Sequence, residues 1–218
     1  MVNVGAGTGS YEPADRDVVA VEPSEAMIAQ RPAGAAPVVR AHAEALPFGD
    51  DSFDAALAVL TDHHWADRCA GLRELRRVAH RAVVFTFDPA YTDAFWLVSE
   101  YLPGFRELPG MTIDELAACL GGADIVPVPI PADCTDGFLG AFWRRPEAYL
   151  DPRVRAGISV FARVPPGGVD ACVRALRADL ESGAWRERHA DLLGLDELDL
   201  GYRLLVSPPA AARTSAAA

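Results

Sequence analysis

Apolar residues recur along the chain in two patterns, as short continuous runs and at a spacing of three or four residues. Short apolar runs bounded by turn residues predict buried strands. We predict strands at residues 2–4, 18–22, 38–39, 55–60, 82–87, 125–130 and 201–206. Apolar residues at helical spacing, preceded by capping residues such as Ser24 and Thr112, predict helices. We predict helices at residues 25–30, 67–80, 92–102, 112–120, 153–161 and 169–180.

The segment between the first two strands is unusual because it leaves little room for a helix. A crossover between parallel strands normally needs a dozen residues, whereas residues 10–17 are few and contain Pro13. We therefore expect one helical turn there or none. Strands that alternate with helices still predict a doubly wound α/β sheet. The prolines in residues 125–130 place that strand near an edge of the sheet.

The chain has the length and apolar content of one well-packed domain, which we predict over residues 1–207. Residues 1–90 form the half with the regular strand and helix alternation, and residues 91–207 form the second half and a helical cap. Residues 208–218 are a low-complexity segment, which predicts a disordered tail.

The first strand runs directly into Gly5-Ala6-Gly7-Thr8-Gly9, and the second strand ends on Glu22. Glycines suit a tight turn in which a ligand lies against bare backbone amides. A carboxylate at the end of the next strand can accept hydrogen bonds from the two hydroxyls of a ribose. Together these features predict a site for a cofactor that contains adenosine.

The same residues resemble the first motif of the class I S-adenosylmethionine-dependent methyltransferases, and the resemblance continues to about residue 90. Val19-Ala20-Val21-Glu22-Pro23-Ser24 looks like the family's acidic strand end. Residues 43–48 and 51–56 resemble its AExLPF and SFD segments, and residues 73–78 the helix before its fifth strand. The resemblance implies a Rossmann-like sheet in the order 3-2-1-4-5-7-6, with the last strand antiparallel, and S-adenosyl-L-methionine as the cofactor.

The resemblance also implies which residues hold that cofactor. The glycines would hold its methionine end, Glu22 its ribose, and Ala43 and Glu44 would flank its adenine. The full set is Gly5, Ala6, Gly7, Gly9, Glu22, Pro23, Met27, His42, Ala43, Glu44 and Leu60. For Met27, packing in a helix core is an equal alternative. Asn3 and His42 depart from the family, because acidic residues are usual at both positions.

Two adjacent histidines, His63 and His64, follow the fourth strand directly. In this family that position lies between cofactor and acceptor, and a histidine is a suitable base for removing an acceptor's proton. Adjacent residues point in different directions on a loop, so we expect at most one of them to face the acceptor. The alternative is that one caps the next helix and the other packs beside Trp65.

Aromatic residues in and after this region favour a flat or apolar small molecule as the acceptor. Trp65, Trp96, Asp88 and Tyr91 are the residues we predict to contact it. A packed cap over the sheet is the alternative for the aromatic residues, and a helix cap is an equal alternative for Asp88.

Charge and cysteine content exclude several classes of function. The formal net charge is −11 and no basic stripe interrupts it, which disfavours nucleic acid as a partner. The four cysteines have no metal-ligand spacing, so we expect no metal and ordinary thiols in a reducing cytoplasm. No apolar run is long enough to span a membrane.

The first strand begins at residue 2, where this family normally has helices that cover the cofactor. A chain without them suggests a rival function, a degenerate module that binds the cofactor without catalysis. A homodimer in which a partner supplies the cover is a further alternative. A nicotinamide oxidoreductase is disfavoured, because the third glycine comes one position early and the AExLPF segment has no role there.

Overall fold

The computed structural model describes residues 1–103, 105 and 110–209, which form two compact units. Unit 1 contains Met1–Phe87, Met111–Pro127 and the described residues from Arg203 onward. Unit 2 contains Val128–Tyr202 and the described residues between Asp88 and Gly110. Two segments of the second half of the chain therefore belong with the first half. Of the tail predicted to be disordered, residues 210–218 lie outside the described residues.

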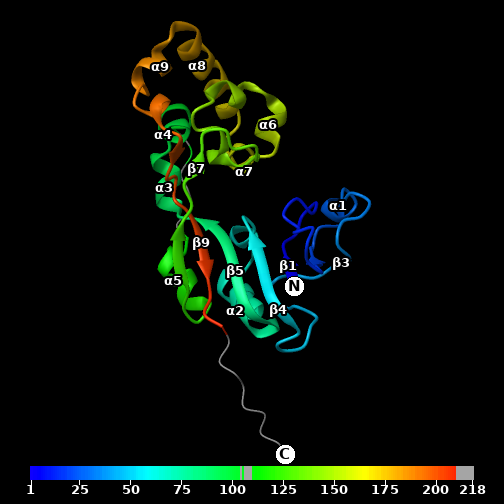
Figure 1. The fold of residues 1–218 in the computed structure, drawn as a ribbon. Helices are drawn as coiled ribbons and strands as arrows, with labels where there is room; N and C mark the ends of the chain where they lie inside the picture. The colour runs from blue at the N-terminus through cyan, green and yellow to red at the C-terminus, as the bar shows by residue number, and fades with distance from the viewer. Residues whose placement is uncertain (104, 106–109, 210–218) are drawn as a thin grey trace, which may run out of the picture. The chain divides into compact units, whose positions relative to one another are not determined.

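Unit 1 is built on a seven-stranded sheet in the order β3-β2-β1-β4-β5-β9-β6 (Figure 1). Its strands are β1 (Val2–Val4), β2 (Val19–Val21), β3 (Val38–Val39), β4 (Phe53–Val59), β5 (Ala79–Phe87), β6 (Asp124–Pro127) and β9 (Tyr202–Val206). β1 to β5 pair in parallel, and β6 pairs antiparallel with β9. This is the predicted Rossmann-like methyltransferase sheet, with β6 at its edge.

The connections in unit 1 follow the local sequence. No helix or strand forms between β1 and β2, as the short segment predicted. Ser24 caps α1 (Glu25–Ile28) by accepting a hydrogen bond from the amide of Met27 at 3.3 Å. After β4 come the 3-10 helix η1 (Asp62–His64) and α2 (Arg68–Val78). Thr112 and Glu115 form the capping box of α5 (Ile113–Cys119).

The core of unit 1 lies between the sheet and two helices. α2 packs against β4, β5 and α5, and it ends at Val78 because Ala79 is already extended and pairs with Phe53. Leu72, Leu75 and Leu116 are completely buried in this core. Each such side chain contributes about 1.5–3 kcal/mol of hydrophobic stabilisation, so this layer anchors the strand ends that form the site.

Unit 2 contains short helices and a two-stranded sheet. Its elements are α3 (Pro89–Ala94), α4 (Trp96–Tyr101), β7 (Ile130–Pro131), η2 (Leu139–Phe142), η3 (Pro146–Leu150), α6 (Pro152–Ala156), α7 (Ser159–Arg163), α8 (Gly168–Ser182), α9 (Ala184–Arg188), η4 (Leu192–Gly194) and β8 (Glu197–Leu198). The helices predicted at 92–102 and 153–161 are each broken in two. Extended backbone at Phe95 and Ile158 causes the breaks and lets both side chains be buried.

Aromatic side chains form the core of unit 2. Trp143 and Trp185 are almost completely buried, and the ring of Trp96 meets that of Trp185 edge-on at 5.2 Å. The indole N–H groups of Trp96 and Trp143 donate to the carbonyls of Trp143 and Ile130, at 3.0 and 2.9 Å. These bonds satisfy buried polar groups that would otherwise destabilise the core.

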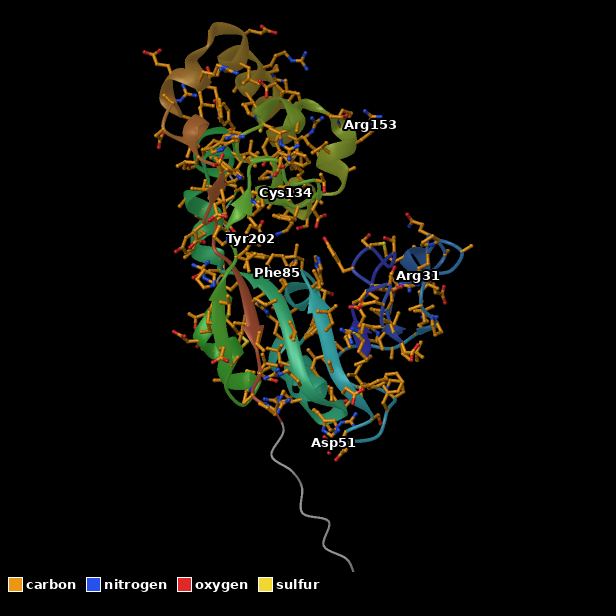
Figure 2. All side chains as sticks on the ribbon, viewed as in Figure 1. Arg31, Asp51, Phe85, Cys134, Arg153 and Tyr202 are labelled. Carbon is orange, nitrogen blue, oxygen red and sulfur yellow. A yellow bond between two sulfur atoms is a disulfide. The ribbon has the colours of Figure 1, made fainter. Side chains whose placement is uncertain are left out.

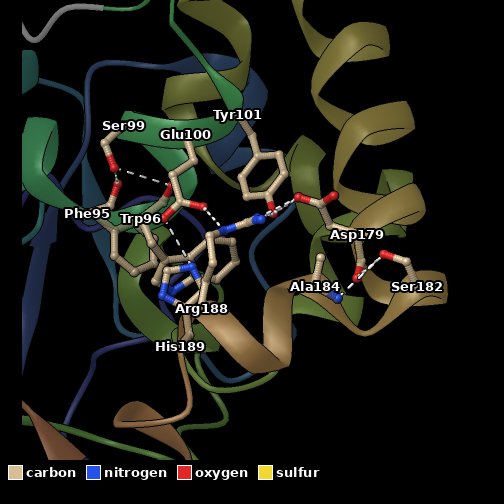
Figure 3. A network of polar contacts seen from close by, with 10 residues as sticks. All are labelled: Phe95, Trp96, Ser99, Glu100, Tyr101, Asp179, Ser182, Ala184, Arg188 and His189. Carbon is tan, nitrogen blue, oxygen red and sulfur yellow. Dashed lines mark hydrogen bonds and ion pairs between the residues drawn. The ribbon is translucent and has the colours of Figure 1, made fainter.

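A polar network joins α4, α8 and α9 at the edge of this aromatic core (Figure 3). The guanidinium of Arg188 donates to Asp179, to the hydroxyl of Tyr101 and to Glu100. The hydrogen bond from Arg188 is the main reason that the pKa of Asp179 is lowered. The network therefore connects three helices through charges that satisfy one another.

The cysteines correct a prediction made from the sequence. Cys69 and Cys119 form a disulfide, with Cα atoms 5.2 Å apart, so the expectation of four ordinary thiols is wrong for this pair. The packing of α2 against α5 brings together residues that are 50 positions apart in the chain. Cys134 and Cys172 are free thiols, and burial raises the pKa of Cys172 to about 11.

Candidate functional site

The loop after β1 is a glycine turn, which we define as residues 5–9. Gly5, Gly7 and Gly9 have φ values of 70°, 53° and 93°, a region that other residues rarely adopt. The amides of Gly5 and Ala6 both donate to the carbonyl of Val21, at 2.8 and 3.0 Å. The turn is therefore fixed to the carboxyl end of β2.

The glycine turn also lies directly against the end of β4. A Cβ atom at Gly5 would lie 2.0 Å from Oγ1 and 2.7 Å from Cβ of Thr61, and Thr61 is itself buried. No side chain fits there unless Thr61 is displaced. Glycine is therefore required at position 5 for two reasons, its conformation and its close contact with β4.

Glu22 ends β2 with its carboxylate turned towards the glycine turn. One oxygen accepts from the amide of Gly7 at 2.8 Å, and the other accepts from the amide of Ser24 at 2.9 Å. The residue is 7% exposed. Ser24, the N-cap of α1, follows Glu22 after Pro23. The carboxylate of Glu22 therefore links the glycine turn to the start of α1. Burying a carboxylate is costly unless its oxygens are hydrogen-bonded, and both are.

Met27 lies on α1 above the turn. Its methyl carbon would be 3.9 Å from a Cβ atom at Gly7, and the side chain is 41% exposed. α1 has no buried residue, so the alternative that Met27 packs in a helix core is wrong. The end of the Met27 side chain is therefore exposed and close to Gly7 of the glycine turn.

The residues expected beside adenine form a loop that α2 holds in place. Ala43 is buried and His42 is exposed, while Glu44 accepts a hydrogen bond from the amide of Asp67 at 3.2 Å. Further along, the amide of Leu46 donates to Glu74 of α2 at 2.9 Å. The loop is thus attached to the helix that follows η1, although His42 itself does not point into the protein.

The chain changes direction sharply where β4 ends. Leu60 has a φ of 49°, which is strained for a bulky side chain, and its amide donates to the carbonyl of Phe85. Asp62 is completely buried and pairs with Arg68 at the start of α2. Its other carboxylate oxygen has no hydrogen-bond partner among the described residues. The strained residue and the buried carboxylate together set the position of η1.

His63 and His64 lie side by side on η1. Their ring centroids are 3.9 Å apart, so the expectation that they point in different directions is wrong. His63 is half-buried with its ring 5.1 Å from that of Phe87, and His64 is exposed. The compact 3-10 turn keeps the two rings together, with His64 the more accessible of the two.

Of the residues predicted to contact an acceptor, Trp65 belongs to unit 1, and Asp88, Tyr91 and Trp96 belong to unit 2. Trp65 turns towards α2, because a Cβ atom at Gly71 would lie 2.4 Å from its ring. In unit 2, Asp88 caps α3 by accepting from the amide of Ala90, and Trp96 is 6% exposed in the aromatic core. Tyr91 is exposed and its ring covers Gly201.

Several residues that support the site were not predicted from the sequence. Thr61, Asp62 and Arg68 hold the end of β4, and Glu12 and Arg31 form a buried ion pair under the glycine turn. They are separated along the chain and match no spacing rule. The short segment at 10–17 was the only sequence signal that something other than a helix must support the turn.

Comparison with known proteins identifies the family. A methyltransferase domain model matches residues 2–87, the segment with the glycine turn, Glu22 and η1. A methyltransferase of Anabaena variabilis, described as coming from an antibiotic biosynthesis pathway, is 33% identical with a TM-score of 0.85. That match covers 95% of this chain and 90% of the other. No curated protein matches at a significant level.

A second solved structure shows the same fold. The Bacillus subtilis protein YcgJ is 16% identical with a TM-score of 0.51, and the match covers 94% of this chain and 88% of that one. The chain therefore belongs to the class I S-adenosylmethionine-dependent methyltransferases.

Proposed function

We propose that this methyltransferase binds S-adenosyl-L-methionine at the glycine turn and transfers its methyl group to a small-molecule acceptor. The observation that carries the proposal is the meeting of three strand ends in unit 1. The turn after β1 directly contacts both Glu22 after β2 and Thr61 after β4. In open α/β sheets, ligands bind beyond the carboxyl ends of the strands at such a point.

The residues present fit this cofactor. A carboxylate offers about four acceptor positions, and the amides of Gly7 and Ser24 occupy two of those on Glu22. Two positions are left for the hydroxyls of a ribose. The bare backbone of the turn suits the methionine end, and the exposed Met27 and buried Ala43 suit a flat apolar base.

S-Adenosylmethionine, when bound, supplies a methyl group on a positively charged sulfur. The chain's own task is to orient the acceptor towards that methyl group and to receive a proton if the acceptor loses one. We propose His64, with His63 beside it, for the proton because it is the exposed member of the pair. Tyr91, which is also exposed, remains our candidate for acceptor contact, together with Trp65, Asp88 and Trp96.

Two observations support a small molecule as the acceptor. The Anabaena relative is described as a methyltransferase from an antibiotic biosynthesis pathway, and antibiotics are small molecules. The net charge of −11 repels polyanions such as nucleic acids.

Among the described residues no helix is long and apolar enough to cross a membrane. The same residues contain no group of three His, Cys, Asp or Glu side chains that could hold a metal.

Calorimetric titration with S-adenosylmethionine, S-adenosylhomocysteine and NAD tests the proposal. The wild-type protein is expected to bind the first two and not NAD. Glu22→Ala should lose at least tenfold in affinity, because the ribose then loses a charged acceptor. Glu25→Ala is the matched control, since that carboxylate is exposed and pairs with exposed Arg40. Binding of NAD alone, or equal binding by both variants, would contradict the proposed site.

The cytoplasm is our proposed compartment, and a homodimer stays a prediction. Disulfides are rare in cytosolic proteins, so the Cys69–Cys119 bond argues against this compartment. The redox state of the two cysteines in cells therefore tests the proposal. Thiol labelling of protein taken from intact cells distinguishes the cases. Reactivity of Cys69 and Cys119 indicates a reducing compartment, and protection of both contradicts the proposed location.

A further inference from the structure

An ion pair lies beneath the glycine turn, between Glu12 and Arg31. Glu12 belongs to the segment between β1 and β2. Arg31, labelled in Figure 2, follows α1. Their side chains are only 10% and 5% exposed. Ion pairs at protein surfaces contribute little, whereas a buried pair is costly unless its remaining donors and acceptors are satisfied. The cost of burying these two charges therefore depends on the other hydrogen bonds that Glu12 and Arg31 form.

The remaining hydrogen bonds of the pair all go to the backbone. Arg31 donates to the carbonyl of Gly7 at 3.1 Å and to the carbonyl of Ala36 at 3.0 Å. Glu12 accepts from the amide of Ala36 at 2.8 Å. Three segments are joined in this way, namely the glycine turn, the connection to β2 and the loop after α1.

The turn also rests directly on the pair. A Cβ atom at Gly9 would lie 3.3 Å both from Nη1 of Arg31 and from Oε2 of Glu12. Gly7 is held from two sides, because its amide donates to Glu22 and its carbonyl accepts from Arg31. Only the contact with Glu22 competes with a ribose for the same carboxylate. The contact with Arg31 is independent of it.

We propose that Arg31 and Glu12 are positioning residues for the cofactor, which support the glycine turn where this fold usually has a helix. Residues 10–17 form no helix or strand, so no helix fixes the carbonyls of the turn. The buried pair fixes the carbonyl of Gly7 and keeps the turn in place when Glu22 engages a ribose. The inference rests on the proposed function and adds two residues to it that do not themselves touch the cofactor.

Titration with S-adenosylhomocysteine on single and double variants tests this role. Arg31→Met should weaken binding by about ten- to a hundredfold, because the charged hydrogen bond to the turn at Gly7 and the link from it to Ala36 are both lost. Arg31→Lys should recover part of the loss, since an ammonium can reach one carbonyl but cannot bridge two. If the pair acts as a unit, the double variant Glu12→Gln with Arg31→Met should lose no more than Arg31→Met alone.

Arg76→Met is the matched control, because Arg76 also donates to backbone carbonyls in unit 1, those of Ala79 and His80. It should bind S-adenosylhomocysteine within twofold of wild type. Amide hydrogen exchange over residues 5–12 is measured on the same proteins, with circular dichroism to confirm folding. Arg31→Met, or Glu12→Gln if the first does not fold, should speed exchange in that segment and leave α5 unchanged.

The outcomes separate the two proposals. If the wild-type protein does not bind S-adenosylhomocysteine, the proposed function is contradicted. The hydrogen-exchange data alone then test whether Arg31 and Glu12 support the turn. Wild-type affinity in a folded Arg31→Met protein, or unchanged exchange over residues 5–12, overturns the positioning role. Faster exchange in α5 as well would show a general loss of stability instead of support for the turn, and would also overturn it.

Discussion

The two units of this protein bury different kinds of residue. Glu22, Asp62 and the buried ion pair of Glu12 and Arg31 all belong to unit 1. Unit 2 instead buries aromatic residues such as Trp143 and Trp185, and its charges pair at the edge of the core. A fold gains little from burying a charge, because desolvation opposes the gain from pairing.

This difference indicates that the buried polar groups have different roles in the two units. In unit 1 the buried carboxylate of Glu22 faces backbone amides beside a glycine turn, an arrangement that a ligand can use. In unit 2 the polar groups of Trp96 and Trp143 are satisfied by the chain itself. Changes in unit 1 should therefore affect cofactor binding, and changes in the core of unit 2 should affect folding.

The largest effect should come from Gly5→Ala. The new methyl group would overlap Thr61 and would also sit at a φ of 70°, so we expect a loss of about 5 kcal/mol or more in unfolding free energy. Gly121→Ala is the control, because Gly121 has a φ of 75° but nothing within 4 Å. Urea denaturation of both measures the difference. Equal losses would show that conformation alone, and not contact with β4, requires Gly5.

Trp96→Ala should have the next largest effect, on folding and not on cofactor binding. Removing a buried indole from the core of unit 2 should cost about 3–5 kcal/mol. The affinity for S-adenosylhomocysteine, measured at a temperature where the variant is folded, should stay within twofold of wild type. A loss of affinity comparable to that of Glu22→Ala would remove the distinction between the two units.

Reduction of the Cys69–Cys119 disulfide should lower the unfolding free energy by about 2–4 kcal/mol, since the bond closes a long loop in the unfolded chain. Urea denaturation with and without dithiothreitol measures this. Cys119→Ser should show the lower stability in both conditions, and Cys134→Ser should behave as wild type. An unchanged wild-type midpoint in dithiothreitol would contradict a structural role for the bond.

The sequence was most informative where local conformation and ligand chemistry require particular residues. The turn at Gly5 and Gly7 could be predicted because a tight turn needs glycines, and the strand order followed from the family resemblance. The role of Glu22 at a ribose stays a prediction. Glu12, Arg31 and Asp62 could not be assigned, because their roles depend on packing between segments that are distant in the chain.

The same limit explains the errors in the second half of the chain. The pattern at 92–102 is helical, but burying both Phe95 and Trp96 requires extended backbone at Phe95. The disulfide likewise depends on α2 packing against α5. Sequence periodicity describes one segment at a time, so it cannot show where two segments meet.

The smallest effect should be that of Glu74→Gln on the pH dependence of stability; Glu74 holds the loop that contains Ala43. The hydrogen bond from Arg77 lowers the pKa of Glu74, and Glu74 also accepts from the amide of Leu46. A lowered carboxyl pKa stabilises the fold above the unfolded value near 4.5, and this is lost as pH falls through the folded value. Glu74→Gln should therefore flatten the decline of stability below pH 4.5. An identical acid decline in both proteins would contradict this.

The most direct test of the account is an NMR titration of the ¹⁵N-labelled protein with S-adenosylhomocysteine. The account predicts that the largest amide shifts occur at Gly7 and Ser24, because both amides share the carboxylate of Glu22 with the ribose. Smaller shifts should follow in the rest of the glycine turn and at Thr61. Saturable binding with its largest shifts in unit 2, or no shifts at all, would contradict a cofactor site at the glycine turn.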